Sequence, residues 1–220
     1  MSTSRSVNVM VLFHSRTGNT LRIAQALARG AGRVPGTTVE LRRVPELVDE
    51  AELLAQPHVG PSFAEIQRLP VAQPDDLAAF DVVVMGAPTR FGSMSSELKH
   101  FIDRLGSNWQ RGDLRNKVGA AFTSASTVHG GHEMTTLGLL ATMMHLGMIV
   151  VTPGYSDPIF ELASAPYGAT AATKPARVRV RPNENDLESA AVLGERTATV
   201  ASWIVRGRAR EVDDVVNDRD

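Results

Sequence analysis

Apolar runs of strand length alternate with amphipathic segments along most of the chain. Runs that can be buried on both faces of a sheet predict five strands, at residues 7–13, 38–44, 81–86, 117–122 and 148–152. Apolar residues at helical spacing predict helices at residues 21–31, 75–80, 97–105, 131–146 and 185–205. Strands that alternate with helices in this way are typical of a doubly wound α/β fold. The pattern predicts a five-stranded parallel sheet of order 2-1-3-4-5 with helices on both faces.

Two segments are longer than the connections of such a sheet require. Residues 45–74 and 153–182 are rich in Pro, Ala and Gly and show no strong period, so we interpret them as insertions. The strand order is that of the flavodoxin-like folds. We therefore expect one flavodoxin-like domain over residues 1–206 that carries both insertions, followed by a flexible C-terminal tail over residues 207–220.

The composition of the chain limits the partners and the reactions that it could have. Lys and Arg number 23 and Asp and Glu number 24, so the chain has no basic surplus for binding nucleic acid. It has no cysteine, which excludes disulfides, thiolate metal sites and cysteine nucleophiles, so redox chemistry would require a bound cofactor. We expect no membrane span, because no apolar run reaches about 18 residues. We expect no signal segment, because the first residues, MSTSRS, are polar and the apolar run behind them is the first predicted strand. A cytoplasmic protein is the expectation.

The turn after the first strand has the residues of a phosphate site. Residues 14–20 read HSRTGNT, in which Ser15, Thr17, Asn19 and Thr20 offer hydroxyl and amide groups. Gly18 permits close approach of the backbone, and the following helix adds N–H donors at its N-terminus. The turn matches neither G-x-x-x-x-G-K-[ST] nor G-x-G-x-x-G, which favours a monophosphate held by mostly neutral donors. A simple hydroxyl-capped helix start has the same residues, so both interpretations stay open.

Two further polar loops follow the third and fourth strands, at residues 88–95 and 123–131. Carboxyl ends of parallel strands meet at one sheet edge, and ligands bind there, at the point where the connections change sides. The first of these loops carries Arg90 and Phe91, which suit a planar ring attached to the phosphate. We expect the three loops to form one crevice.

Several stretches together resemble the WrbA-type NAD(P)H:quinone oxidoreductases, a flavodoxin-like family that binds FMN. They are SRTGNT, GAPTRFGSMSSELKHFIDRLGSNW, TSASTVHGGHE, MMHLGMIVVTPGY and APYGAT. The resemblance covers roughly residues 7–205. It implies bound FMN, NAD(P)H as the electron donor, and a quinone as the acceptor that takes two electrons in a ping-pong mechanism.

The resemblance also implies which residues bind the cofactor. The FMN phosphate would be held by Ser15, Arg16, Thr17, Gly18, Asn19 and Thr20. The isoalloxazine would be bordered by Pro88, Thr89, Arg90, Phe91 and Gly92. Its pyrimidine end and the ribityl chain would contact Ser124, Ala125, Ser126, Thr127, His129 and Gly130.

Two more residues and an assembly follow from the same resemblance. Trp109 would line the pocket in which nicotinamide and quinone bind in turn, and His145 would approach the flavin site. His145 could there donate a proton to the nascent hydroquinone, although a histidine at a helix end also often binds the last carbonyls. The family is typically tetrameric, so a homotetramer built as a dimer of dimers is expected, without nucleic acid.

Some features depart from the family or allow another interpretation. Ala125-Ser126 stand where Thr-Gly is commoner, and His132 replaces a commoner Gln. His129, His132 and Glu133 superficially suit zinc, but no third strong ligand is near in sequence, so no metal site is predicted. Two other functions stay open. One is a flavodoxin-type carrier of single electrons. The other is a non-enzymatic flavin-binding protein that regulates or binds other proteins.

Overall fold

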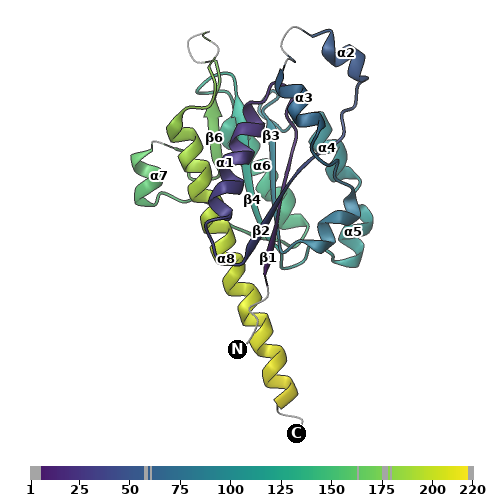
Figure 1. Ribbon diagram of the computed structural model, residues 1–220, viewed down its shortest axis with the longest axis vertical. Coiled ribbons are helices and arrows are strands. Elements are labelled where there is room, and N and C mark those ends of the chain that lie inside the picture. The colour runs from purple at the N-terminus through teal and green to yellow at the C-terminus, as the bar shows by residue number, and fades with distance from the viewer. Residues whose placement is uncertain are drawn as a thin grey trace.

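The computed structural model describes residues 6–56, 59, 61–162, 164–174, 178 and 180–217. Its central sheet is parallel and follows the order β2-β1-β3-β4-β5, which confirms the predicted topology (Figure 1). The strands are β1 (Val7–Phe13), β2 (Thr37–Arg43), β3 (Val82–Pro88), β4 (Val118–Ala125) and β5 (Ile149–Val150).

The outer edge next to β4 differs from the prediction. The predicted strand over residues 148–152 is wrong in extent, because β5 contains only Ile149 and Val150. A sixth strand, β6 (Ala169–Ala172), pairs in parallel with the carboxyl half of β4. The second insertion thus contributes a strand of its own beside β4. Pro153 helps to end β5, because proline has no N–H to donate to the ladder.

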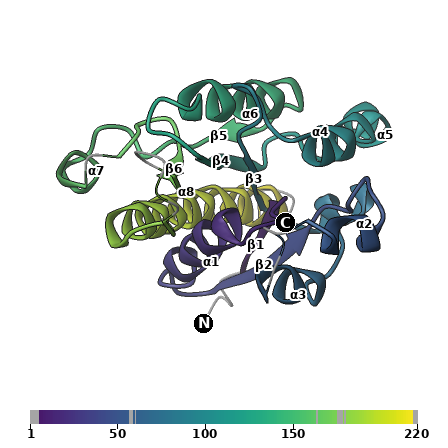
Figure 2. The same ribbon diagram turned by 90° about the horizontal axis from the view of Figure 1, so that it is seen from above.

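Helices cover both faces of the sheet (Figure 2). Helices α1 (Asn19–Ala31) and α8 (Glu184–Asn217) lie on one face. Helices α4 (Ser96–Asp103), α5 (Gly106–Arg111) and α6 (His132–His145) lie on the other. The side chains of β1 alternate between the two cores, as a strand buried on both faces requires. Val9 and Val11 pack toward α1 and α8, and Met10 and Leu12 pack toward α4 and α6.

Two glycines bring α1 and α8 into backbone contact. A Cβ atom on Gly30 would lie 1.9 Å from the carbonyl oxygen of Ala191, and one on Gly194 would lie 2.1 Å from that of Leu27. The helices can approach this closely only because glycine has no side chain. Since α1 begins at Asn19, within the HSRTGNT stretch, this packing also fixes the turn.

The insertions contain short helices that the sequence did not predict. The first carries α2 (Glu50–Leu54) and α3 (Pro61–Gln67). The 3₁₀ helix η1 (Pro74–Ala79) follows this insertion and overlaps the helix predicted at 75–80. The second carries α7 (Asp157–Glu161). The helix predicted at 97–105 is confirmed as α4, and the short helix α5, which was not predicted, follows it.

Helix α8 is longer than expected. It continues past Val205 to Asn217 and projects beyond the sheet (Figure 1), so the predicted end near residue 205 is wrong. Residues 218–220 of the predicted tail lie outside the described residues. None of the helices in the described ranges combines the length and apolarity needed to cross a membrane.

Candidate functional site

The structure brings the three predicted loops together at the carboxyl edge of β1, β3 and β4. They form a pocket of about 160 Å³. This is smaller than the roughly 300–1,000 Å³ of a site that encloses a drug-sized ligand, so the pocket holds one end of a larger ligand. Its lining consists of Ser15, Arg16, Thr17, Asn19, Thr20, Pro88, Thr89, Arg90, Ser124, Ala125, Ser126, Thr173 and Lys174.

The HSRTGNT turn leaves backbone donors available in this pocket. Gly18 adopts a left-handed conformation with φ of 82° and precedes α1 without a side-chain cap. The Ser15 hydroxyl accepts from the N–H of Leu21 at 3.4 Å. Within the described ranges, no group accepts a hydrogen bond from the main-chain N–H groups of residues 16–20. Such a cluster of free donors at a helix N-terminus suits an anion.

Both insertions contact this turn. A Cβ atom on Gly18 would lie 2.4 Å from the hydroxyl oxygen of Ser62, which is in α3 of the first insertion. Arg181 of the second insertion donates through Nη1 to the carbonyl oxygen of Thr17 at 2.6 Å and to Oδ1 of Asn19 at 3.3 Å. These contacts join residues far apart in sequence, so no local pattern predicts them.

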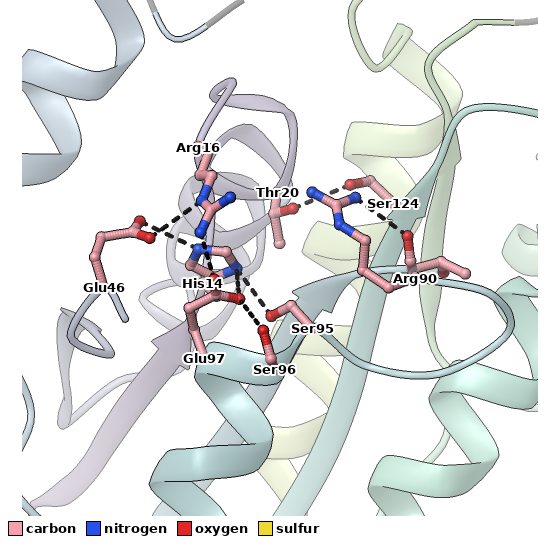
Figure 3. A network of polar contacts seen from close by, with 10 residues as sticks. His14, Arg16, Thr20, Glu46, Arg90, Ser95, Ser96, Glu97 and Ser124 are labelled. Carbon is pink, nitrogen blue, oxygen red and sulfur yellow. Dashed lines mark hydrogen bonds and ion pairs between the residues drawn. The ribbon is translucent and has the colours of Figure 1, made fainter. Parts of the chain in front are cut away.

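Hydroxyl groups fasten the three loops to one another. Thr20 Oγ1 lies 3.0 Å from Ser124 Oγ, which joins the first turn to the end of β4 (Figure 3). Thr89 Oγ1 lies 3.0 Å from Thr123 Oγ1 and 3.1 Å from Thr135 Oγ1, which joins the second loop to β4 and α6. These hydrogen bonds fix the positions of the three loops relative to one another.

The loop after β3 presents an aromatic ring to solvent. Phe91 is fully exposed and has a positive φ of 51°, which is uncommon for a bulky residue. The backbone is held in this tight turn because the N–H of Arg90 donates to Ser93 at 2.7 Å and the N–H of Ser93 donates back at 3.0 Å. Strained conformations of this kind are often retained at functional positions.

A second pocket of about 600 Å³ adjoins the first, since Arg16 and Arg90 line both. Its lining combines apolar side chains with four charged ones and two hydroxyls: Leu47, Val48, Phe91, Met94, Arg16, Arg90, Glu97, Lys99, Ser93 and Ser96. Gly92 is not part of the lining of this pocket. It packs against the start of α6, because a Cβ atom on Gly131 would lie 2.8 Å from the Cα of Gly92. This pocket is open and partly apolar, which suits a flat organic ligand.

The loop after β4 contributes unevenly to the site. Ser124, Ala125 and Ser126 line the first pocket, whereas Thr127, His129 and Gly130 are outside its lining. His132 is buried, and its Nε2 lies 3.0 Å from the carbonyl oxygen of Ala171. His132 therefore ties α6 to β6.

Trp109 and His145 do not lie at these pockets within one chain. Trp109 is on α5. Its neighbour Asn108 donates to the Pro74 carbonyl at 3.3 Å, at the start of η1. Since η1 comes before β3 in the chain, this contact is away from the loop that follows β3 at the pockets. His145 is the last of the 14 residues of α6, and that helix starts beside the pocket. A helix of this length places its ends about 20 Å apart. A role for either residue at the site therefore requires a second copy of the chain.

A charged cluster that the sequence did not predict lies beside the turn (Figure 3). His14 is buried, with Nδ1 2.8 Å from Ser95 Oγ and Nε2 3.2 Å from Oε1 of Glu46. Arg16 pairs with Glu46 at 3.1 Å and also with Glu97. These residues come from three separate segments, and the sequence offers no spacing that links them.

Arg16 already supplies positive charge to this cluster. Donor atoms of His14, Glu46 and Glu97 lie within 4.8 Å of one another, as in a metal site, but both carboxylates pair with the Arg16 guanidinium. Burial raises the pKa of the Glu46 carboxyl. The hydrogen bond and charge of His14 and the charge of Arg16 outweigh burial, so this pKa lies below its ordinary value.

Comparisons with known proteins agree with this geometry. Residues 8–158 match the family model described as NADPH-dependent FMN reductase. A protein from Aromatoleum aromaticum named NAD(P)H dehydrogenase (quinone) is 38% identical, over 92% of this chain and 100% of its own length. One of the same name from Afipia carboxidovorans is 41% identical, over 88% and 96%.

Solved structures show the same fold. The WrbA-like flavodoxin from Agrobacterium tumefaciens superposes with a TM-score of 0.61 at 25% identity, over 90% of this chain and 99% of that one. The sheet order, the length of the match and the level of identity all point to one assignment. The chain belongs to the WrbA-type NAD(P)H:quinone oxidoreductases, within the NADPH-dependent FMN reductase family.

Proposed function

We propose that this protein uses bound FMN to transfer two electrons from NAD(P)H to quinones in a ping-pong mechanism. The observation that carries the proposal is the pocket in which free N–H donors of residues 16–20 meet the hydroxyls of two neighbouring loops. The names of the relatives, NAD(P)H dehydrogenase (quinone), support the same substrates.

The residues present fit FMN. The free N–H groups and the hydroxyls of Ser15, Thr17 and Thr20 would hold the phosphate, and the left-handed Gly18 allows the backbone to approach it. The size of the first pocket suits the phosphate end of the cofactor, and Pro88, Thr89 and Arg90 in its lining would border the adjoining part of the ring system. The residues proposed around the isoalloxazine and the ribityl chain are Pro88, Thr89, Arg90, Phe91, Gly92, Ser124, Ala125, Ser126, Thr127, His129 and Gly130.

When bound, FMN supplies the chemistry of hydride acceptance and donation. Arg90 is exposed at the boundary of the two pockets and would stabilise negative charge on the ring. Phe91 offers a flat apolar surface against which nicotinamide or quinone can stack. The second pocket is open enough for each substrate in turn, which is what a ping-pong order requires.

The assembled protein is proposed to be a homotetramer in which a second copy brings Trp109 or His145 to the site. An apolar surface on α6 and the loop before it supports this assembly. Val128, Met134, Leu137 and Met144 are exposed there. Large exposed apolar side chains grouped on one element are typical of a protein interface.

Steady-state kinetics test the mechanism. Initial rates measured with NADPH and benzoquinone both varied should give parallel double-reciprocal lines, because the first product leaves before the second substrate binds. Intersecting lines would contradict a shared pocket. Photoreduction tests the competing carrier function, since accumulation of a stable half-reduced flavin without quinone turnover would favour a flavodoxin-type role.

A further inference from the structure

We propose that the second insertion supplies the positive charge that binds the cofactor phosphate, through Lys174 in the pocket and Arg181 on the turn. The proposal rests on the proposed function, because it concerns the phosphate of the FMN assigned above. It adds two residues that neither the sequence motifs nor the phosphate turn itself contains.

The arginine of the turn is already neutralised. Arg16 lines the pocket, but its guanidinium pairs with Glu46 at 3.1 Å and with Glu97. Two carboxylates against one guanidinium leave no net positive charge there for a dianionic phosphate. The neutral donors of the turn can hold the phosphate, and other cations near the pocket would add the balancing charge.

Lys174 is placed in the pocket by the extension of β6. The N–H of Thr173 donates to Ala125 at 2.8 Å, and the N–H of Lys174 donates to Ser126 at 2.6 Å. These bonds continue the pairing of β6 with β4 as far as the pocket lining, of which Lys174 is part. Across the described residues no carboxylate lies within 4.0 Å of its ammonium group, so the full charge of Lys174 is available to an anion.

Arg181 binds the turn through its side chain but is not part of the lining of the pocket. Val180 lies beside Thr173, since its N–H donates to the Thr173 carbonyl at 2.9 Å. Arg181 then donates to the Thr17 carbonyl and to Asn19 Oδ1. It engages the two acceptors that flank Gly18, so the N–H groups of the turn are left for the ligand. We assign Arg181 as a positioning residue that also adds positive charge.

The roles proposed for Lys174 and Arg181 predict that their removal affects the binding of FMN but not that of riboflavin. Riboflavin has the same ring and ribityl chain as FMN but lacks the phosphate. Removal of a cation that binds phosphate should weaken FMN binding and leave riboflavin binding unchanged. It should also reduce the dependence of FMN affinity on salt, because fewer charges are screened.

The experiment is fluorescence titration of the full-length apoprotein with FMN and with riboflavin at low and high salt. Lys174→Gln should raise the Kd for FMN about tenfold, as expected for loss of one charge-assisted hydrogen bond. Arg181→Gln should raise it by a smaller factor. Arg196→Gln is the matched control, because Arg196 also donates to a backbone carbonyl, that of Thr152 at 2.9 Å, and lies in α8. Its Kd for FMN should equal that of the wild type.

Three results would overturn the proposal. Unchanged FMN affinity in both variants would show that the insertion contributes no charge. Parallel loss of riboflavin affinity would show a structural effect. A changed ratio of the KM for NADPH to that for NADH, with unchanged FMN affinity, would assign the cations to the 2′-phosphate of the co-substrate. If the wild type binds neither flavin, the proposed function itself fails, which is a separate and distinguishable outcome.

Discussion

Thr20 and Ser124 face each other across the candidate site, with their hydroxyl oxygens 3.0 Å apart and both side chains buried. Thr20 is in the first turn of α1, and Ser124 is near the end of β4. One hydroxyl pair therefore joins the proposed phosphate turn to the loop proposed to contact the rest of the cofactor.

Thr20→Val should weaken FMN binding about tenfold, because valine keeps the shape but removes the hydroxyl and leaves Ser124 without its partner. Fluorescence titration with FMN measures the change. Thr142→Val is the matched control, since the Thr142 hydroxyl donates within α6, to the Gly138 carbonyl at 2.9 Å. Equal FMN affinity in Thr20→Val and in the control would contradict the role of this hydroxyl.

Gly30→Ala should destabilise the protein by about 1–3 kcal/mol or more, because the added methyl group would collide with the backbone of α8 at Ala191. Urea unfolding measures the loss. Gly207→Ala, in α8 with open space around it, should be neutral or stabilise by up to about 1 kcal/mol. A stability of Gly30→Ala equal to that of the wild type would show that α1 and α8 are not in backbone contact.

Glu46→Gln should change how the free energy of unfolding depends on pH in the acid range. The pKa of Glu46 is lowered in the folded state, so its charged form stabilises the fold above its ordinary pKa, about 4.5. That contribution is lost as the pH falls through the lowered value. The variant should therefore be less stable than the wild type at pH 7, and the difference should shrink as the pH falls below about 4.5.

Urea unfolding at several pH values between 7 and about 3 measures the effect of Glu46→Gln. The control is Glu52→Gln in α2, whose side chain is exposed. A difference between Glu46→Gln and the wild type that stays constant across this range would show that ionisation of Glu46 does not stabilise the fold.

His145→Ala and Trp109→Ala should lower quinone turnover while FMN affinity stays as in the wild type, because both residues lie away from the pockets of their own chain. Leu137→Glu, on the exposed surface of α6, should lower turnover in the same way by dissociating the proposed homotetramer. Turnover and molar mass in solution are the measurements. Unchanged turnover of His145→Ala at saturating substrate would remove the proton-donor role.

The layers of the fold could be predicted because burial on both faces leaves a clear mark in the sequence. Val82–Pro88 is almost entirely apolar, and it is the central strand β3. The sequence of β6 does not indicate a strand. Ala169–Ala172 reads ATAA and has few of the branched and aromatic residues that are enriched in strands. Its position depends on pairing with β4, which local sequence does not encode.

The same distinction applies to the site. The turn and the two loops were predictable because each follows a strand end, and strand ends of a parallel sheet meet. The pairing of Arg16 with Glu46 and Glu97, and the bond from Arg181 to Thr17, were not predictable. They join segments about 30 to 160 residues apart, and no periodicity or motif connects such partners.

The most direct measurement is the rate at which the purified apoprotein reduces benzoquinone with NADH or NADPH, with and without added FMN. If the HSRTGNT turn and its neighbouring loops hold FMN for quinone reduction, turnover should appear only when FMN is supplied and should saturate at one FMN per chain. Absence of turnover in protein that has bound FMN would contradict the proposed function.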